Sequence, residues 1–166
     1  MLKSEFKSSP FKTIVLLYTF FTLFFALLYE LPVARHHAIP FVDVLFLSAS
    51  AMSVTGLSTI SVADELTRLG DVILMIQLQF GGIGIMAIVG SLLLFVKRDA
   101  SLHQQTLMSF DQNQKGLRSV KQLMIFIFSF SLGLEFISAL IFLPTFYHTT
   151  GDWSESMFLS VFHSIS

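Results

Sequence analysis

The chain has 166 residues, of which 54% are hydrophobic and 13% are charged, and its mean hydropathy of +0.75 indicates a membrane protein rather than a soluble domain. The 10 Lys and Arg residues balance 11 Asp and Glu residues, so electrostatics gives no case for nucleic-acid binding. The absence of cysteine excludes disulfides, thiolate metal sites and cysteine nucleophiles.

The first uncharged hydrophobic run covers residues 13–29 and follows Lys3 and Lys7. As a helix it reaches about 25 Å, near the short end of what spans a bilayer. Glu30 and Pro32 follow it without a small-residue cleavage signal. We therefore interpret the run as a retained helix and not as a signal peptide.

Two later runs are also long enough to span a membrane. Residues 72–96 carry no charge, and residues 122–146 carry only Glu135. Residues 41–52 lie between the first two spans and are largely apolar, but as a helix they reach only about 18 Å. This short segment cannot cross a bilayer.

Basic residues indicate the orientation of the chain. They gather before the first span and between the second and third spans: Lys3, Lys7, Lys12, Lys97, Arg98, Lys115, Arg118 and Lys121. The positive-inside rule places the N-terminus, 1–12, and the loop 97–121 in the cytoplasm. Both flanks of the short segment 41–52 are then outside, so we expect it to form a re-entrant hairpin.

The sequence of this hairpin predicts a cation site. Pro40 suits the first position of a helix, and the carbonyl end of that helix would point partial negative charge into the membrane. The chain returns through the uncharged residues 53–58, where Gly56 can adopt a positive φ. Backbone at this depth is tolerated where it lines a watery path, and its oxygens can replace the water of a monovalent cation. The alternative is an ordinary turn between helices.

The same order begins again after the loop 97–121. A span at 122–146 is followed by an acidic segment and by M-F-L-S-V-F-H-S-I-S, which parallels L-F-L-S-A-S-A-M-S of the first hairpin. The predicted fold is an all-α membrane protein built of repeated span, pore-helix and span units with a re-entrant filter loop. One repeat, 13–96, is complete, and residues 122–166 form the first half of a second.

The segment F-L-S-A-S-A-M-S-V-T-G-L-S-T, followed by Q-L-Q-F-G-G-I-G-I-M, resembles the first repeat of the Ktr/Trk superfamily of potassium transporters, in particular the ion-translocating membrane subunit of Ktr type. The pattern extends over residues 13–166 and is strongest from Ser48 to Met86. The resemblance implies potassium as the ion, no organic cofactor in this chain, and a multi-pass protein of the bacterial inner membrane. It also implies a homodimer on a cytoplasmic nucleotide-binding ring.

The same resemblance implies the site residues. Carbonyl donors to potassium would be Val54, Thr55, Gly56 and Leu57, with Ser53 as a weaker candidate and the ion at Thr55 and Gly56. Family members carry four repeats around one pore, whereas this sequence holds one filter strand. We therefore expect the remaining repeats as partners, and a second glycine-bearing hairpin shortly beyond Ser166.

A glycine-rich stretch lies in the second span. Gly82, Gly84 and Ala87 match the dinucleotide fingerprint G-x-G-x-x-A, but no strand precedes them, so this interpretation is rejected. We expect Gly81, Gly82 and Gly84 to allow close packing of helices, together with the pair Ala87 and Ser91, and a hinge is the alternative.

Glu135 is an isolated carboxylate within the third span. Such a group is costly unless it faces the interior of a bundle and finds a partner. Two interpretations remain open: Glu135 is neutral, or it pairs with a donor on a helix outside this sequence.

Three further patterns are weighed against ordinary structure. Residues 111–116, D-Q-N-Q-K-G, begin like a calcium loop, but Lys115 stands where an oxygen ligand is required. The loop 97–121 is expected to dock the regulatory ring, with attraction to lipid headgroups as the alternative. His36 and His37 are adjacent and would point apart, so we expect no metal site there.

Potassium transport through a carbonyl-lined filter is the favoured function. A two-span subunit of a tetrameric potassium channel is an alternative, although the third span and second short helix count against it. A non-conducting structural or assembly protein of the membrane is another. No Ser-His-Asp set, zinc pattern or pair of carboxylates occurs within a span, so we expect no enzyme.

Overall fold

The computed structural model describes residues 10–84 and 117–166, and this part of the chain is helical without strands. The helices are α1 (Pro10–Tyr29), α2 (Phe41–Met52), α3 (Val62–Glu65), α4 (Arg68–Ile83), α7 (Leu117–Thr150) and α8 (Trp153–Ile165). The expectations for the pair Ala87 and Ser91, for most of the loop 97–121 and for the segment 111–116 lie outside the described residues.

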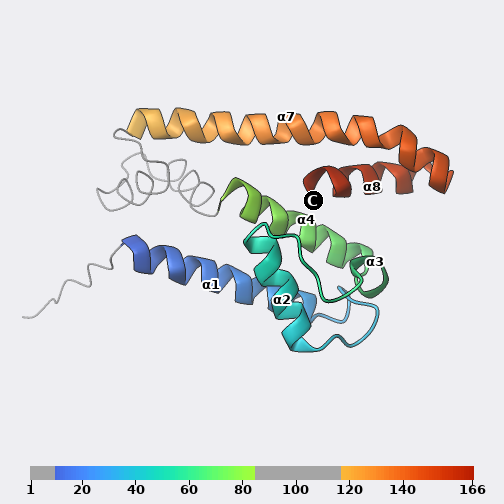
Figure 1. The fold of residues 1–166 in the computed structure, drawn as a ribbon, viewed down its shortest axis with the longest axis horizontal. Coiled ribbons are helices and arrows are strands. Elements are labelled where there is room, and N and C mark those ends of the chain that lie inside the picture. The colour runs from blue at the N-terminus through green and yellow to red at the C-terminus, as the bar shows by residue number, and fades with distance from the viewer. Residues whose placement is uncertain (1–9, 85–116) are drawn as a thin grey trace, which may run out of the picture.

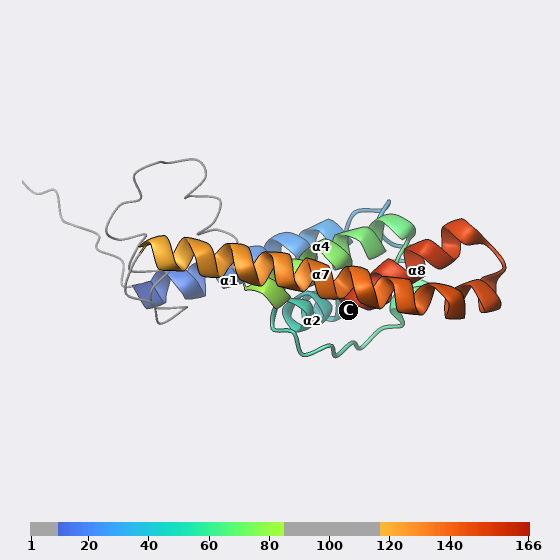
Figure 2. The same ribbon diagram turned by 90° about the horizontal axis from the view of Figure 1, so that it is seen from above.

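Three long helices run along the same axis. The start of α1, the end of α4 and the start of α7 lie at one end of the molecule, and α3 lies at the other end with the turn between α7 and α8 (Figure 1). Helix α2 crosses the direction of the long helices, and α8 folds back along α7 (Figures 1 and 2). The order of a long helix followed by a short one therefore occurs twice.

The helix bounds can be compared with the hydrophobic runs. Helix α1 contains the run 13–29, and α2 coincides with the predicted short helix 41–52, with Pro40 just before its first residue. Helix α7 is longer than the run 122–146 and continues through Pro144. Helix α4 ends inside the run 72–96, because Gly84 adopts a φ of 87° that an α-helix cannot continue.

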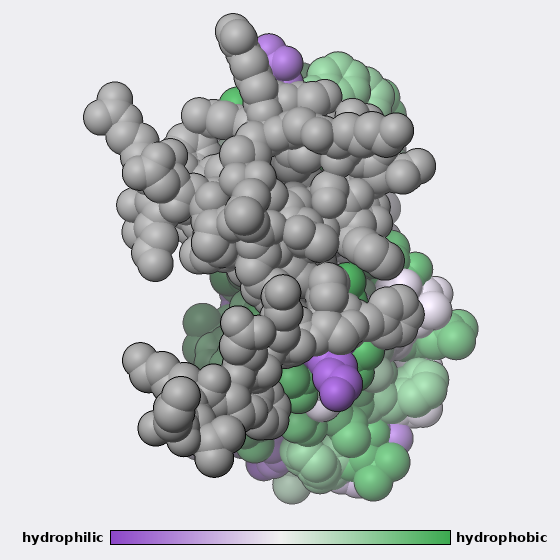
Figure 3. Space-filling view, turned by 90° about the vertical axis from the view of Figure 1, so that its left-hand side faces the viewer, coloured by the Kyte–Doolittle hydropathy of each residue, from purple (hydrophilic) through white to green (hydrophobic). Residues whose placement is uncertain are grey.

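Length and apolar composition distinguish these helices further. Among the described residues, Ile125–Thr150 is long and apolar enough to cross a membrane, while Ile14–Tyr29 and Phe41–Met52 are shorter apolar stretches. The described residues visible in Figure 3 are mostly hydrophobic. Large apolar side chains on α1 and α7 stand exposed, including Leu16, Leu27, Phe136 and Ile141. Such a surface fits contact with lipid or with further helices.

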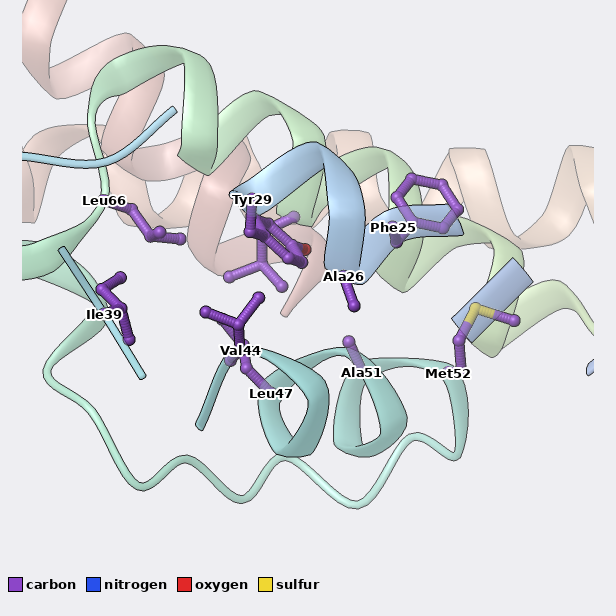
Figure 4. Packing of buried hydrophobic residues seen from close by; sticks show 10 residues of the cluster. Phe25, Ala26, Tyr29, Ile39, Val44, Leu47, Ala51, Met52 and Leu66 are labelled. Carbon is purple, nitrogen blue, oxygen red and sulfur yellow. The ribbon is translucent and has the colours of Figure 1, made fainter. Parts of the chain in front are cut away.

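The core joins α1 to α2. Ala26 of α1 points toward α2, which contributes the buried residues Val44, Leu47, Ala51 and Met52 (Figure 4). Phe25 and Tyr29 of α1 belong to the same buried cluster. Ala26 is fully buried and Ala51 is 3% exposed, and neither side chain extends beyond Cβ. These two small residues let the backbones of the crossing helices approach closely.

Gly81 brings α4 against the carboxyl end of α2. A Cβ atom at this position would lie 2.4 Å from the carbonyl oxygen of Ala51 and 3.0 Å from that of Met52. Both are backbone atoms, so they cannot turn away as a flexible side chain can. Of the three glycines expected to allow close packing, Gly81 is the one with a tight contact among residues 10–84 and 117–166, where Gly82 and Gly84 have no such neighbour within 4 Å.

We expect Gly81→Ala to lower the melting temperature of the purified protein, because overpacking of this kind typically costs about 1–3 kcal/mol. The matched control is Gly82→Ala, one residue along the same helix with open space around it. Its melting temperature should be unchanged or slightly higher, since Ala is the better helix former. Equal melting temperatures for the two variants would contradict the close contact at Gly81.

Candidate functional site

The chain leaves α2 through a turn at residues 53–54 and continues without regular structure to residue 58. Two residues here have positive φ angles: Val54 at 56° and Gly56 at 70°. Gly56 adopts this conformation readily because it has no Cβ. Val54 is β-branched, and such a residue at positive φ is strained. This second positive φ was not predicted from the sequence.

The N–H groups of the segment 53–57 are mostly bonded to α2. Ser53 N donates to the carbonyl oxygen of Ala49 at 3.0 Å, and Val54 N donates to that of Ala51 at 3.4 Å. Thr55 N donates to the backbone oxygen of Ser50 at 3.1 Å, and Leu57 N donates to the Ser50 hydroxyl at 2.7 Å. The donors of this segment therefore point back at the helix from which it emerges.

The carbonyl oxygens of the same segment, unlike most of its N–H groups, have no hydrogen-bond partner among the described residues. Within residues 10–84 and 117–166, none of the carbonyl oxygens of residues 53–57 accepts a hydrogen bond. All five residues are exposed. Peptide oxygens without a donor partner are the ligands that hard monovalent cations take in selective pores. The negative end of the α2 dipole also favours a cation here.

Side chains hold the hairpin at both ends. Near the carboxyl end of α2, the hydroxyl groups of Ser50 and Thr55 lie 2.9 Å apart. Near the amino end, the Thr59 hydroxyl donates to Asp43 Oδ1 at 2.7 Å. Ser50 is 5% exposed, so its hydroxyl is a buried support for the returning segment. This supporting role of Ser50 was not predicted from the sequence.

A buried hydrogen-bond network fixes the position of α2 against the two long helices. Gln77 of α4 is fully buried; its Nε2 donates to the Ser48 hydroxyl at 2.7 Å and to the Ser48 carbonyl at 2.9 Å. Gln77 Oε1 accepts a hydrogen bond from the Tyr29 hydroxyl at 2.6 Å, and the Ser48 hydroxyl donates one to the Thr22 carbonyl at 2.7 Å. Residues of α1, α2 and α4 thus form one network behind the hairpin.

Sequence reasoning missed this network. Its signal was present in the sequence, because Gln77 is an amide within an uncharged span and a polar group at such a depth must find a partner. Ser48 was read only as part of a motif. The partners are determined by the rotation of three helices relative to one another. This rotation cannot be predicted from the spacing of residues in the sequence.

We expect Gln77→Leu to destabilise the protein by about 1–3 kcal/mol, because it leaves the buried Tyr29 hydroxyl without its acceptor and removes the donor to the Ser48 carbonyl and hydroxyl. The same substitution at Gln122, which is exposed on α7, is the control. Thermal unfolding in detergent measures both. A Gln77→Leu protein that melts with the control would show that the network contributes no stability.

Glu135 of α7 finds its partners within this chain. Gln79 Nε2 of α4 donates to one of its carboxylate oxygens, and the Ser131 hydroxyl donates to the other at 2.9 Å. The expected donor on a helix outside the sequence is therefore replaced by a donor on α4. Glu135 and Gln79 also line a largely apolar cavity of about 470 Å³ between α4, α7 and α8.

Comparison with known proteins identifies the family. Residues 8–166 match the family model TrkH, described as a cation transport protein. The chain belongs to the TrkH family. This is a family of integral membrane transporters and not of enzymes, as the hydrophobic composition and the motifs around Gly56 predicted.

Named relatives cover most of this chain. It is 32% identical over 141 residues to the Ktr system potassium uptake protein B of Bacillus subtilis, a match that covers 85% of this chain and 32% of the relative. It is 35% identical over 161 residues to the Ktr system potassium uptake protein D of the same organism, covering 95% of this chain and 36% of the relative. The potassium/sodium uptake protein NtpJ of Enterococcus hirae is 29% identical over 130 residues, covering 76% and 28%. The chain thus spans about a third of the length of these TrkH-family relatives.

Proposed function

We propose that this chain contributes the first filter strand of a potassium transporter in the bacterial cell membrane, with its N-terminus in the cytoplasm. The observation that carries the proposal is the asymmetry of the segment 53–57. The N–H groups of Ser53, Val54, Thr55 and Leu57 are bonded to α2, while the carbonyl oxygens of the segment accept no hydrogen bond from the described residues. The names of the relatives, which are potassium uptake proteins, supply the choice of ion.

The proposed mechanism is replacement of the ion's water by main-chain oxygens. A potassium ion that sheds water needs several oxygens at once, and the carbonyls of Val54, Thr55, Gly56 and Leu57 provide one set, with Ser53 at the edge. The positive φ angles at Val54 and Gly56 permit neighbouring carbonyls to turn toward one side. Because α2 already binds the N–H groups, the segment need not reorganise when the ion arrives.

One strand does not surround an ion. We propose that the other strands come from the further repeats of the complete transporter, since this chain spans about a third of its relatives' length. We also propose a homodimer that docks on a cytoplasmic nucleotide-binding ring through the loop 97–121. The alternatives are a two-span subunit of a tetrameric channel and a non-conducting membrane protein. A substitution at Gly56 should abolish conduction by a transporter or a channel and leave a non-conducting protein unaffected.

The first test is Gly56→Leu in the complete gene product, expressed in a bacterial strain that lacks potassium uptake. We expect uptake to fall by about tenfold or more, because a side chain at this φ displaces the neighbouring carbonyls and removes part of the ion's coordination. Rubidium or potassium flux and growth at low potassium measure the effect.

The control for this test is Gly151→Leu. Gly151 also has a positive φ, 68°, and no neighbour within 4 Å of its Cβ position, but it lies in the turn before α8. The two variants therefore share the backbone strain and differ in location. Full uptake by the Gly56 variant would exclude an ion site at this segment and favour the non-conducting protein.

The second test is Ser50→Ala, which removes the acceptor for Leu57 N and the partner of the Thr55 hydroxyl. Loss of such a support costs about 1 kcal/mol, so we expect discrimination between potassium and sodium to fall several-fold while uptake persists. Ser58→Ala is the control, because among the described residues the Ser58 hydroxyl bonds within the loop, to Ile60. Unchanged discrimination in the Ser50 variant would remove Ser50 from the site.

A further inference from the structure

A charged contact joins the two halves of the described chain at the end where α7 turns into α8. The Arg68 guanidinium of α4 makes two bonds to the Glu155 carboxylate of α8, with Nη1 to Oε1 at 3.0 Å and Nη2 to Oε2 at 2.5 Å. The same guanidinium carbon lies 3.8 Å from the centre of the Phe158 ring. We name these three residues, Arg68, Glu155 and Phe158, the α4–α8 clasp.

The geometry of the clasp is more specific than that of an ordinary surface ion pair. Two parallel N–H···O bonds fix the plane of the guanidinium, and the aromatic ring covers one of its faces. Arg68 is 48% exposed and Glu155 is 41% exposed, so the pair adds little stability by charge attraction alone. The contact instead fixes the orientation of α8 relative to α4.

The α4 side of the clasp is anchored in the first unit, by which we mean helices α1 to α4. Thr67 directly precedes Arg68, and its hydroxyl accepts the N–H of Gly70 as the cap of α4. The same hydroxyl donates to the Val33 carbonyl at 2.6 Å, and Thr67 N donates to the Ala34 carbonyl at 3.1 Å. Arg68 therefore projects from a position that is tied to the connection between α1 and α2.

The α8 side is anchored as well. Asp152 caps α8 by accepting the N–H of Ser154 at 3.1 Å, and the Ser156 hydroxyl donates back to the Asp152 carbonyl. Glu155 lies in the first turn of this helix. Farther along α8, Phe162 packs against the core cluster of the first unit. Helix α8 is thus held against the first unit at two points along its length, by the clasp and by Phe162.

We propose that the α4–α8 clasp is a positioning element that sets the angle of α8 against the first unit and thereby the geometry of the ion site. The inference rests on the proposed function and on the prediction from sequence that residues 122–166, which include α8, form the first half of a second repeat. Helix α8 is about 20 Å long, so a tilt at Glu155 moves its carboxyl end, where the next strand would begin. Arg68, Glu155 and Phe158 act through α8 and do not touch the ion.

The test uses single and double charge reversals in the complete gene product: Arg68→Glu, Glu155→Arg, and both together. We expect the half-saturating potassium concentration to rise about fivefold in each single variant, because both lose the pairing and gain a like-charge contact. The double reversal restores the pair and should return this concentration to within about twofold of the unmodified protein. The amount of each variant in the membrane is measured in parallel.

The two single variants change the external charge in opposite directions, which separates positioning from electrostatic attraction of potassium. If Arg68 and Glu155 acted only on the local ion concentration, the half-saturating concentrations would shift in opposite directions. Arg68→Lys gives a second comparison, since it keeps the charge and loses the two-bond geometry. We expect it to raise the half-saturating concentration as well. Asp64→Arg, on the neighbouring α3, is the control for added positive charge.

The outcomes distinguish the clasp from the proposed function. Opposite shifts in the single variants, a double reversal as impaired as the singles, or unchanged half-saturation in all of them would overturn the clasp. Absence of potassium uptake by the unmodified gene product would overturn the proposed function, and the role of the clasp with it. Equal losses of maximal rate and membrane abundance, at constant half-saturation, would reduce the clasp to a folding contact.

Discussion

The hydrogen-bond network centred on Gln77 is the constraint on which the hairpin depends. A short helix that does not cross a membrane has few contacts of its own, and in α2 the hydroxyl of Ser48 is shared between the Gln77 amide and the Thr22 carbonyl. Because all these groups are buried, each must find a partner, and one relative placement of α1, α2 and α4 satisfies them together. The direction of α2 follows from that placement, and so does the position at which residues 53–57 emerge.

The prediction of α2 from sequence succeeded to the residue, because local chemistry determines both of its ends. Pro40 prevents the helix from extending toward the amino end, and the polar residues from Ser53 onward offer bonds that compete with a further turn. Helix α7 extends beyond the predicted span 122–146 at both ends, and it passes through Pro144 because the other backbone bonds of the helix remain. For α4 the uncharged run concealed an interruption that depends on the backbone angle of Gly84.

The candidate segment 53–57 could be picked out from the sequence, but the residues that support it could not. A glycine among uncharged small residues after a half-length helix is a local pattern, so residues 53–57 could be found from sequence, although their role as ion ligands remains a proposal. Ser50, Gln77 and the pairing of Glu135 with Gln79 depend on contacts between residues far apart in the chain. The strain at Val54 could not be foreseen either, since β-branched residues normally avoid positive φ.

The contact at Gly81 also limits how α4 can move against α2. At Gly81 the backbone of α4 packs directly against the last carbonyl groups of α2, with no side chain between them. Turning α4 about its own axis would drive the Cβ of a neighbouring residue into those oxygens. A conformational change that keeps this contact therefore moves α2 and this part of α4 together as one rigid body, and residues 53–57 keep their place at the end of α2.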